Sequence, residues 1–399
     1  MKLWIALFSL GLAGTGFAAD ATNLGEAFTN GKINLNLRLR YEGVEQTGLQ
    51  DAEALTLRTR LGFTTAPWLG WKAMLEAEDV RAADGDSYSQ AGLNPGGAGQ
   101  AVIADPEMTE INQAWLAFTT GQTTGTLGRQ RLVLDNARFI GDVAWRQNMQ
   151  TYDAFVLQDK TLAKTTLTYA YLQQINRVFG PDHPQGKWAS SSNLFNASYA
   201  GLPAGTLTGY AYLLDFSSSP ANSCATYGAS FAGTTKLSAG VSFTYRAEAA
   251  TQSDYGASTL NYDARYTVLE AGLAWKPASL LLGYEVLGSD HNVGFKTPLA
   301  TLHAFNGWAD LFLTTPAAGL RDTYAKLTAN LPGECPLVVF YHQFDSDAGG
   351  IDFGHELDLS LSHKFGKRVT VLAKFADYRR VSLLYPNVQK VWVQLEFVY

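Results

Sequence analysis

LGRQRLVLDNARFIGDVAWRQNMQTYDAFVL, residues 127–157, is the stretch from which the fold of this chain is interpreted. Runs typical of strands flank it, and charged residues of both signs lie within and between them: Arg129, Arg131, Arg138, Arg146, Asp135, Asp142 and Asp153. In residues 125–133 the strand period of two puts Arg129 and Arg131 on one face. We expect this face to line a water-filled channel, because the rest of the chain repeats the alternation with the opposite face apolar.

The same alternation recurs at intervals along the chain. In residues 32–42 Arg38 and Arg40 alternate with apolar residues, and in residues 55–63 Arg58 and Arg60 do the same. Alternating segments of about ten residues, separated by turn residues, are the signature of a membrane β-barrel. The predicted strands are 32–42, 55–63, 71–78, 109–119, 124–134, 150–158, 163–174, 193–201, 205–216, 225–232, 235–248, 259–275, 279–289, 320–330, 336–346, 355–365, 369–379 and 390–399.

The connections between these strands alternate between short and long. Outer-membrane barrels have short periplasmic turns and longer external loops. With both termini periplasmic, this alternation predicts an all-β, membrane-spanning, antiparallel up-and-down barrel of 18 strands. Sixteen strands are the alternative, since the count treats 259–275 as one strand and 290–319 as one loop. Arg265 and Glu270 share a lumen face only if residues 262–275 contain a bulge.

The two ends of the chain agree with a barrel in the outer membrane. Lys2 precedes an apolar run over residues 3–12, and small residues at Gly16 and Ala18 predict a signal peptide, residues 1–18, cleaved after Ala18. The last strand alternates up to Tyr399 and would pair with the first to remove both sheet edges. No break in composition divides residues 19–399, so we expect a single barrel domain. A soluble sandwich or propeller is the alternative, but a propeller requires a blade-length repeat that we do not find.

Composition excludes several classes of protein. A net charge of −6 argues against nucleic-acid binding, and two cysteines do not make a disulfide scaffold. The chain has no run of 18 apolar residues of the kind that forms a transmembrane helix. Cys224 is predicted in an external loop and Cys335 in a periplasmic turn, so we expect no disulfide between them. The six histidines show no catalytic or metal-ligand grouping, with His342 and His363 expected on outward positions. We therefore expect no enzyme activity, metal or cofactor.

Several segments resemble the alginate export family of outer-membrane proteins. They are GRQRLVLDNARFIGDVAWRQN (128–148), FNGWADLFLTTPAAGLRD (305–322), FDSDAGG (344–350), LAKFADY (372–378) and VWVQLEFVY (391–399). The resemblance spans nearly the whole chain after the signal peptide. It implies an 18-stranded barrel with an arginine-rich lumen, which in the best-known branch passes a polyanionic uronate polymer outward. Many members share the barrel without an established substrate.

The candidate site is the set of polar residues that the predicted strands and loops place toward the lumen. Arginine suits an anion channel because it stays charged and binds carboxylates through two parallel hydrogen bonds. The alternative is that the arginines brace the barrel through ion pairs between strands. Arg138 and Arg146 either fold inward as a constriction or belong to a solvated external loop. The candidate residues are Arg38, Arg40, Arg58, Arg60, Arg129, Arg131, Arg138, Arg146, Glu76, Glu110 and Arg246.

Acidic residues on the same faces weaken the positive field of the lumen. They are Glu76, Glu78, Glu110, Glu248, Glu356, Asp358 and Glu396. We therefore expect a channel for anionic or polar organic solutes, related to sugar acids or oligosaccharides, rather than one for alginate itself. A substrate-specific uptake porin for small carboxylates is one alternative, and a plugged structural or receptor barrel is another. The expected partners are outer-membrane lipid and the solute, and we expect a monomer.

Two loops offer further candidates. Phe305 and Trp308 are expected either to stack on sugar rings or cap the pore, or simply to pack within the loop. Asp345, Asp347 and Asp352 resemble a sparse set of calcium ligands, although such residues also form polar surface turns.

Overall fold

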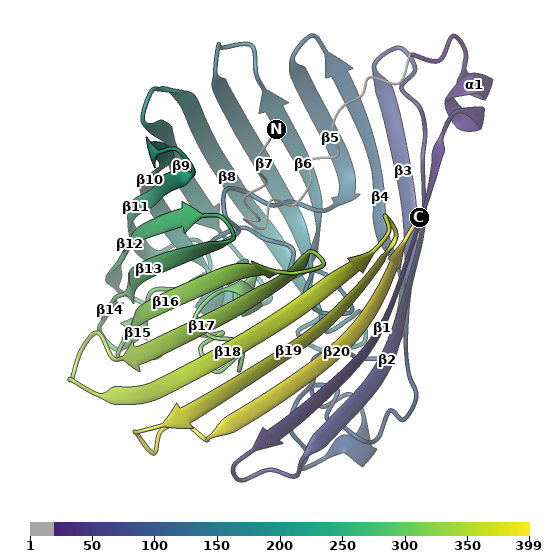
Figure 1. Ribbon diagram of the computed structural model, residues 1–399. Coiled ribbons are helices and arrows are strands. Elements are labelled where there is room, and N and C mark those ends of the chain that lie inside the picture. Colours follow the sequence, from purple (N-terminus) through teal and green to yellow (C-terminus); the bar gives the residue numbers. More distant parts are fainter. Residues whose placement is uncertain (1–19) are drawn as a thin grey trace.

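The computed structural model describes residues 20–399, so the predicted signal peptide, residues 1–18, lies outside the described residues. Eighteen antiparallel strands form one sheet, and β1 pairs with both β2 and β20. This double pairing closes the sheet into a barrel (Figure 1). The prediction of 18 strands is therefore confirmed. Among the described residues, no helix has the length and apolar character needed to cross a bilayer.

The wall follows the chain order, with each strand paired to its neighbours in sequence. Two short strands form a separate hairpin that is not part of the wall, and the described residues also contain one α-helix and three 3₁₀ turns. The elements are α1 (Leu24–Thr29), β1 (Lys32–Gln46), β2 (Ala52–Thr64), β3 (Trp71–Ala82), η1 (Pro95–Gly97), β4 (Met108–Thr120), β5 (Thr123–Gln130), β6 (Thr151–Asp159), β7 (Thr165–Asn176), β8 (Lys187–Leu202), β9 (Gly205–Leu214), η2 (Pro220–Asn222), β10 (Cys224–Ser238), β11 (Val241–Asp254), β12 (Asp263–Trp275), β13 (Ala278–Leu287), β14 (Ser289–Asp290), β15 (Val293–Gly294), η3 (Leu302–Ala304), β16 (Leu320–Leu331), β17 (Cys335–Asp345), β18 (Asp352–Phe365), β19 (Val369–Arg380) and β20 (Val388–Val398).

Side chains alternate across the wall as a membrane barrel requires. In β20, Val391, Val393 and Leu395 are exposed on the outside, whereas Trp392 and Gln394 are buried inside. Hydrocarbon covers the outer apolar face in the membrane, and closure leaves no unpaired sheet edge in the lipid. The short turns and both ends of the described chain lie at the same, periplasmic end, and the long loops lie at the external end.

Two local predictions are wrong, and one open point is decided. The β10–β11 turn lies at residues 239–240, not at 233–235, because the pairing continues through Gly233. β5 ends at Gln130 rather than at residue 134. The open point is the bulge in residues 262–275: β12 pairs without a register shift with both neighbours, so it has no bulge, and Arg265 lies on the exposed outer face rather than sharing a face with Glu270.

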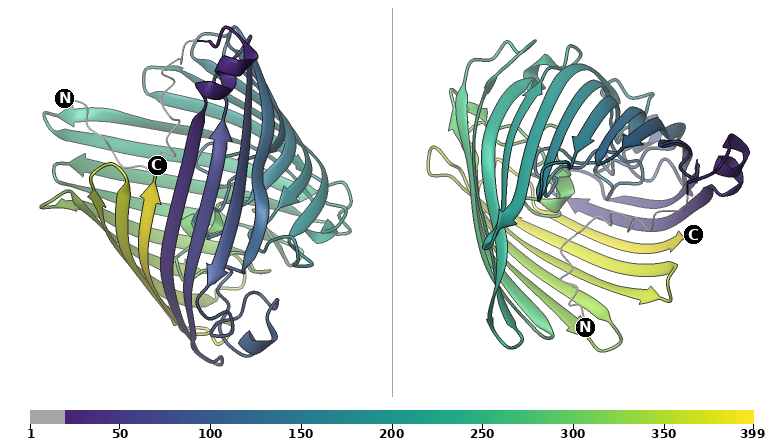
Figure 2. Two further views of the ribbon diagram at one scale, coloured as in Figure 1. Left: turned by 90° about the vertical axis from the view of Figure 1, so that its right-hand side faces the viewer. Right: turned by 90° about the horizontal axis from the view of Figure 1, so that it is seen from above.

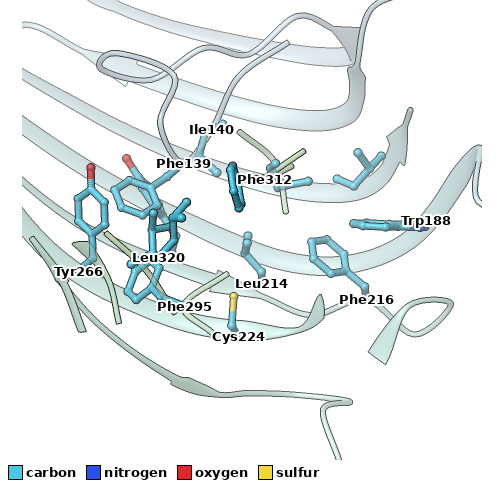
Figure 3. Close-up of a cluster of buried hydrophobic side chains, with 14 of the residues drawn as sticks. Phe139, Ile140, Trp188, Leu214, Phe216, Cys224, Tyr266, Phe295, Phe312 and Leu320 are labelled. Carbon is cyan, nitrogen blue, oxygen red and sulfur yellow. The ribbon is translucent and has the colours of Figure 1, made fainter. Parts of the chain in front are cut away.

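Two long loops fold back into the barrel instead of standing above it. They are residues 131–150, between β5 and β6, and residues 288–319, between β13 and β16, which we call the inward loops (Figure 2). Phe139 and Ile140 from the first loop and Phe295 from the second belong to one buried cluster with Tyr266 of the wall (Figure 3). The Phe139 ring lies 5.2 Å from that of Tyr266 and 6.0 Å from that of Phe295. This core holds both loops against the wall and so positions the site.

The two inward loops also bond directly to each other. The amide of Gly141 donates to the carbonyl of Leu299 at 2.8 Å, and the amide of Thr301 donates to the carbonyl of Ala137 at 2.9 Å. Tyr152 of β6 donates its hydroxyl to the Gly141 carbonyl at 2.6 Å. The loops therefore form one packed unit within the external half of the barrel.

Candidate functional site

Four arginines from the first two strands point into the lumen. Arg38 and Arg40 are two residues apart in β1, and Arg58 and Arg60 are two residues apart in β2, with Arg38 directly opposite Arg58. Their relative exposures are only 0–9%. Burying like charges this close is unfavourable unless each guanidinium has partners. The sequence prediction that these four line the lumen agrees with their position, but they do not face open water.

Their partners are largely the main-chain carbonyls of one inward loop. Arg38 donates to the carbonyls of residues 144, 145 and 146 at 3.1, 3.2 and 3.4 Å. Arg40 donates to the carbonyl of residue 145 at 2.5 Å. Arg58 and Arg60 both donate to the carbonyl of residue 147, at 3.3 and 3.2 Å. Four wall cations thus hold four consecutive carbonyl groups of the loop; we call this arrangement the arginine clamp.

Carboxylates supply the remaining charge balance of the arginine clamp. Glu396 of β20 accepts from Arg38 at 3.1 Å and from Arg58 at 3.2 Å. Glu78 of β3 accepts from Arg60. Asp105, from the loop between β3 and β4, lies 3.5 Å from Arg40. The bracing interpretation therefore describes these arginines in this conformation.

A second charged junction ties the two inward loops to each other and to the wall. Arg146 of the first loop donates to both oxygens of Glu42, at 3.1 and 3.0 Å, and to Asp310 of the second loop at 2.8 Å. Asp310 also accepts from Lys390 of β20 at 2.9 Å and from His303 Nδ1 at 2.7 Å. One buried carboxylate thus joins three donors from three separate segments.

An aromatic cage adjoins this junction. The imidazole of His303 stacks on Trp145, with ring centroids 4.6 Å apart and planes 2° from parallel. Lys374 of β19 donates to His303 Nε2 at 2.6 Å and lies 4.2 Å from the Trp145 ring and 3.5 Å from the Trp308 ring. Because Lys374 donates to Nε2, His303 carries its proton on Nδ1 and donates it to Asp310. The imidazole therefore links the buried Lys374 side chain to the buried Asp310 carboxylate.

Charge and burial set the protonation of the loop groups. Burial and the nearby Lys374 charge hold the pKa of His303 well below its usual value, so the docked imidazole is neutral. Burial alone would raise the pKa of Asp310, but His303, Lys390 and Arg146 outweigh it and hold that pKa well below the usual value. The carboxylates around Arg146 raise its pKa despite burial. The Asp310 carboxylate and the Arg146 guanidinium of the docked junction therefore keep their charges at neutral pH.

Arg138 anchors the other side of the first inward loop. It donates to Glu285 of β13 at 2.7 and 3.2 Å and to the Asn306 side chain at 3.0 Å, and it lies 4.7 Å from the Phe305 ring. Tyr266 donates its hydroxyl to the same carboxylate at 2.7 Å. Between the two alternatives for Arg138 and Arg146, the structure therefore has both folded inward and buried. Phe305 packs on a guanidinium.

The turn at residues 306–309 holds two wall carboxylates. Asn306 and Gly307 both have positive φ, at 54° and 84°, which turns the following amides toward β18. The Ala309 amide donates to Glu356 at 2.7 Å, and the Trp308 amide donates to Asp358 at 3.3 Å. A methyl group at residue 307 would lie 2.3 Å from a Glu356 oxygen, so glycine is required there. Trp308 is buried by these contacts.

Two predicted pore-lining arginines lie elsewhere. Arg129 shares a face with Leu127, which is exposed on the outside, so its pair with Asp153 at 2.7 Å lies on the outer wall. The strand pattern is ambiguous there, because Leu127 alternates in phase with the arginines. Arg131 follows the end of β5 and bonds to Asp142 within its own loop at 3.0 Å. Neither residue belongs to the arginine clamp.

The other predicted lumen residues do face inward. Glu76 accepts from the side chains of Asn112 and Gln113 at 2.6 and 3.0 Å. Glu110 lies opposite Glu78 in the β3–β4 ladder and is partly buried. Arg246 bonds to Glu248, two residues along β11, at 3.2 Å.

Several residues of the site were not found from the sequence. Asp310, Lys374 and Lys390 were not singled out, and His303 was assigned only to a loop. His342 was expected to face outward, which is wrong: it is buried, and its Nδ1 lies 2.9 Å from Asp322. The signal that was missed is Phe340 and Phe344, which show that the inner face of β17 is aromatic.

The remaining loop predictions concern surface residues. Asp347 and Ser346 accept from Arg321 through their main-chain carbonyls at 3.0 and 2.9 Å, as in a surface turn. Within residues 20–399 no group of three His, Cys, Asp or Glu side chains is placed to hold a metal. Cys224 and Cys335 are both free and begin strands at opposite ends of the barrel.

Comparison with known proteins agrees with this architecture. The sequence model of the alginate export family matches residues 29–171, which confirms the resemblance to that family. OpdK of Pseudomonas aeruginosa, solved with vanillate, is 14% identical with a TM-score of 0.74, over 93% of this chain and 99% of that chain. OccK9 (OpdG) of the same organism is 14% identical with a TM-score of 0.75, over 94% and 100% of the two chains. OccAB3 of Acinetobacter baumannii is 14% identical with a TM-score of 0.75, over 93% and 99%. No curated protein matches the chain. The chain has the fold of outer-membrane porins and is an outer-membrane β-barrel.

Proposed function

We propose that this protein is an outer-membrane channel for small organic anions, carboxylates in particular, which the inward loops close in the conformation described. The arginine clamp carries the proposal. Its guanidinium groups bind neutral carbonyl oxygens, whereas a carboxylate carries a full negative charge and can accept two parallel hydrogen bonds from one guanidinium. A carboxylate is therefore a competitor for the loop carbonyls.

The packing of the inward loops favours a small solute over a polymer. The external half of the lumen contains both loops, joined by their own hydrogen bonds and by the Phe139 cluster. A uronate polymer would require both loops to leave the lumen, whereas a small anion needs only local displacement. OpdK, which shares this fold, was solved with vanillate, which bears a single carboxylate.

Ion selectivity in a planar bilayer tests the proposal. We expect the reversal potential under a salt gradient to show anion preference, and a small carboxylate to reduce the chloride current. Arg38→Gln/Arg60→Gln, which keeps hydrogen-bond donors and removes two charges, should lower both effects. Arg265→Gln removes an exposed outer-face charge and is the matched control. Cation preference, or equal behaviour of the three proteins, would reject the arginine clamp as a solute site.

A plugged structural or receptor barrel is the second candidate function. The observation that favours it is the complete burial of Arg40, Arg58 and Arg138 in contacts that also involve the loops. Steady single-channel conductance of the wild-type protein would exclude this candidate. The plugged barrel would be supported if the wild-type protein shows no conductance and a variant with weakened contacts between the inward loops does.

A further inference from the structure

The described chain begins with a short helix that no strand pattern predicts. α1 lies outside the wall, at the rim near the periplasmic ends of β1 to β3 (Figures 1 and 2). Its start is specified locally: Asn23 accepts from the amide of Glu26 at 2.9 Å, and Glu26 accepts from the amide of Thr22 at 2.9 Å. Reciprocal caps of this kind define a helix N-terminus.

Backbone and aromatic contacts fix α1 to the barrel. The amide of Ala66, in the β2–β3 turn, donates to the carbonyl of Ala27 at 2.8 Å. The rings of Phe28 and Phe63 stack with centroids 6.2 Å apart and planes 4° from parallel. Gly31 makes this stacking possible, because a methyl group there would lie 2.2 Å from the Phe63 ring. The orientation of the helix on the wall is therefore determined.

This orientation leaves two apolar side chains of the helix more than half exposed. Leu24 and Phe28, one turn apart, are 54% and 56% exposed, whereas Ala27 is buried against the barrel. A rotation of 100° per residue puts Glu26 on the side opposite Leu24 and Phe28. The helix thus has a wall side, an apolar side and an acidic side.

The apolar side continues the outer surface of the barrel. Ile33 at the start of β1, Leu69 in the β2–β3 turn and Trp71 at the start of β3 are all exposed. Trp71 packs against Phe118 at the periplasmic end of β4, with centroids 4.8 Å apart. Aromatic residues are typical of the interface level of outer-membrane barrels. The surface beside α1 is therefore the edge of the lipid-facing band.

We propose that α1 is an interfacial anchor whose Leu24 and Phe28 side chains insert into the periplasmic leaflet of the outer membrane. The occupant is phospholipid, because the apolar side of α1 adjoins the surface that lipid already covers. Glu26 then faces the periplasm. The anchor fixes the start of β1, the strand that closes the barrel against β20.

Site-specific fluorescence in vesicles tests the anchor. In a Cys224→Ser/Cys335→Ser background, an environment-sensitive dye is attached to Phe28→Cys or, as the matched control, to Thr29→Cys on the water side. Both proteins are reconstituted in phosphatidylethanolamine–phosphatidylglycerol vesicles and, in parallel, in a lipid-free amphipathic polymer. Heat-modifiable gel mobility verifies that each labelled barrel is folded.

The expected result is a clear difference between the two positions that depends on lipid. The dye at residue 28 should be blue-shifted in vesicles and quenched by nitroxide-labelled phospholipid, at a depth of about 5–10 Å into the interface. The dye at residue 29 should be quenched by iodide. Equal iodide quenching at both positions, or the same emission from residue 28 with and without lipid, would overturn the proposal. This test does not measure conductance, so its outcome is independent of the proposed channel function.

Discussion

Asp310→Asn is the most informative perturbation of the inward loops. The carboxylate accepts from Arg146 at 2.8 Å, from Lys390 at 2.9 Å and from His303 at 2.7 Å. Asparagine has nearly the same shape but no charge, and its amide group turns one acceptor into a donor. Two buried cations would then lose their shared anion while the rest of the cluster stays in place.

The magnitude follows from breaking a buried ion pair. Removing one partner from such a pair costs about 3–5 kcal/mol, because the remaining charge is left buried without compensation. We expect this loss to fall on loop docking, since Asp310 lies in a loop and the wall keeps its strand pairing. The docked-to-undocked ratio should therefore fall by about 150-fold to several thousand-fold.

Hydrogen exchange measured by mass spectrometry reports this equilibrium directly. Protection of amides in residues 137–150 and 299–310 should fall by about two to nearly four orders of magnitude. The conductance of the same protein should rise. Asp79→Asn is the control, because its pair with Arg81 is exposed and such pairs contribute about 0–1 kcal/mol. Unchanged loop protection in a folded Asp310→Asn barrel would refute the assignment of Asp310 as the loop junction.

Three further predictions concern pH, the wall and the outer face. Docking holds the pKa of His303 below its usual value, so as the pH falls the undocked state takes up a proton on this imidazole before the docked state does. The free energy that favours docking should therefore decrease by up to about 1.4 kcal/mol per pH unit as the pH falls below 6.5. Channel opening should rise over that range, and His303→Gln, which keeps one donor and one acceptor, should remove this dependence. Gly128→Ala should destabilise the barrel by at least about 1–3 kcal/mol in urea unfolding, because φ is 122° and the methyl would lie 2.3 Å from a carbonyl oxygen of the neighbouring strand. Gly209→Ala, whose methyl meets nothing within 4 Å, should be close to neutral, and equal midpoints would contradict this reasoning. Arg129→Gln should leave the reversal potential unchanged, because the pair of Arg129 with Asp153 lies on the outer wall. A shift of the reversal potential toward cation preference would mean that Arg129 lines the lumen after all.

The wall of this protein is readable from the chain because a barrel strand obeys a local rule. Each of Arg38, Arg40, Arg58 and Arg60 is assigned to the lumen by a period of two, and apolar neighbours identify the lipid side. Alternating loop lengths then predict the even strand number. The same rule misplaced Arg129, because Leu127 lies in phase with it and is exposed on the outer face of β5.

The site depends on contacts that no local rule contains. Arg146 meets Asp310 across 164 positions of sequence, and Arg38 meets the carbonyls of residues 144–146 across more than 100. The periodicity of a strand says which way a wall residue points, but not whether its partner is water, a solute or another loop. Loops have no such period, so whether residues 131–150 stand above the barrel or enter it is undetermined by pattern alone.

Alternation, turn chemistry and chain ends thus specify an 18-stranded outer-membrane barrel with arginines on its inner face, since these features act between near neighbours. Tertiary structure decides that those arginines are buried under loop carbonyls, that Asp310 joins both inward loops to the wall, and that α1 presents Leu24 and Phe28 outward. The physical reason is that buried charges require partners, and those partners come from segments that only the closed barrel brings together.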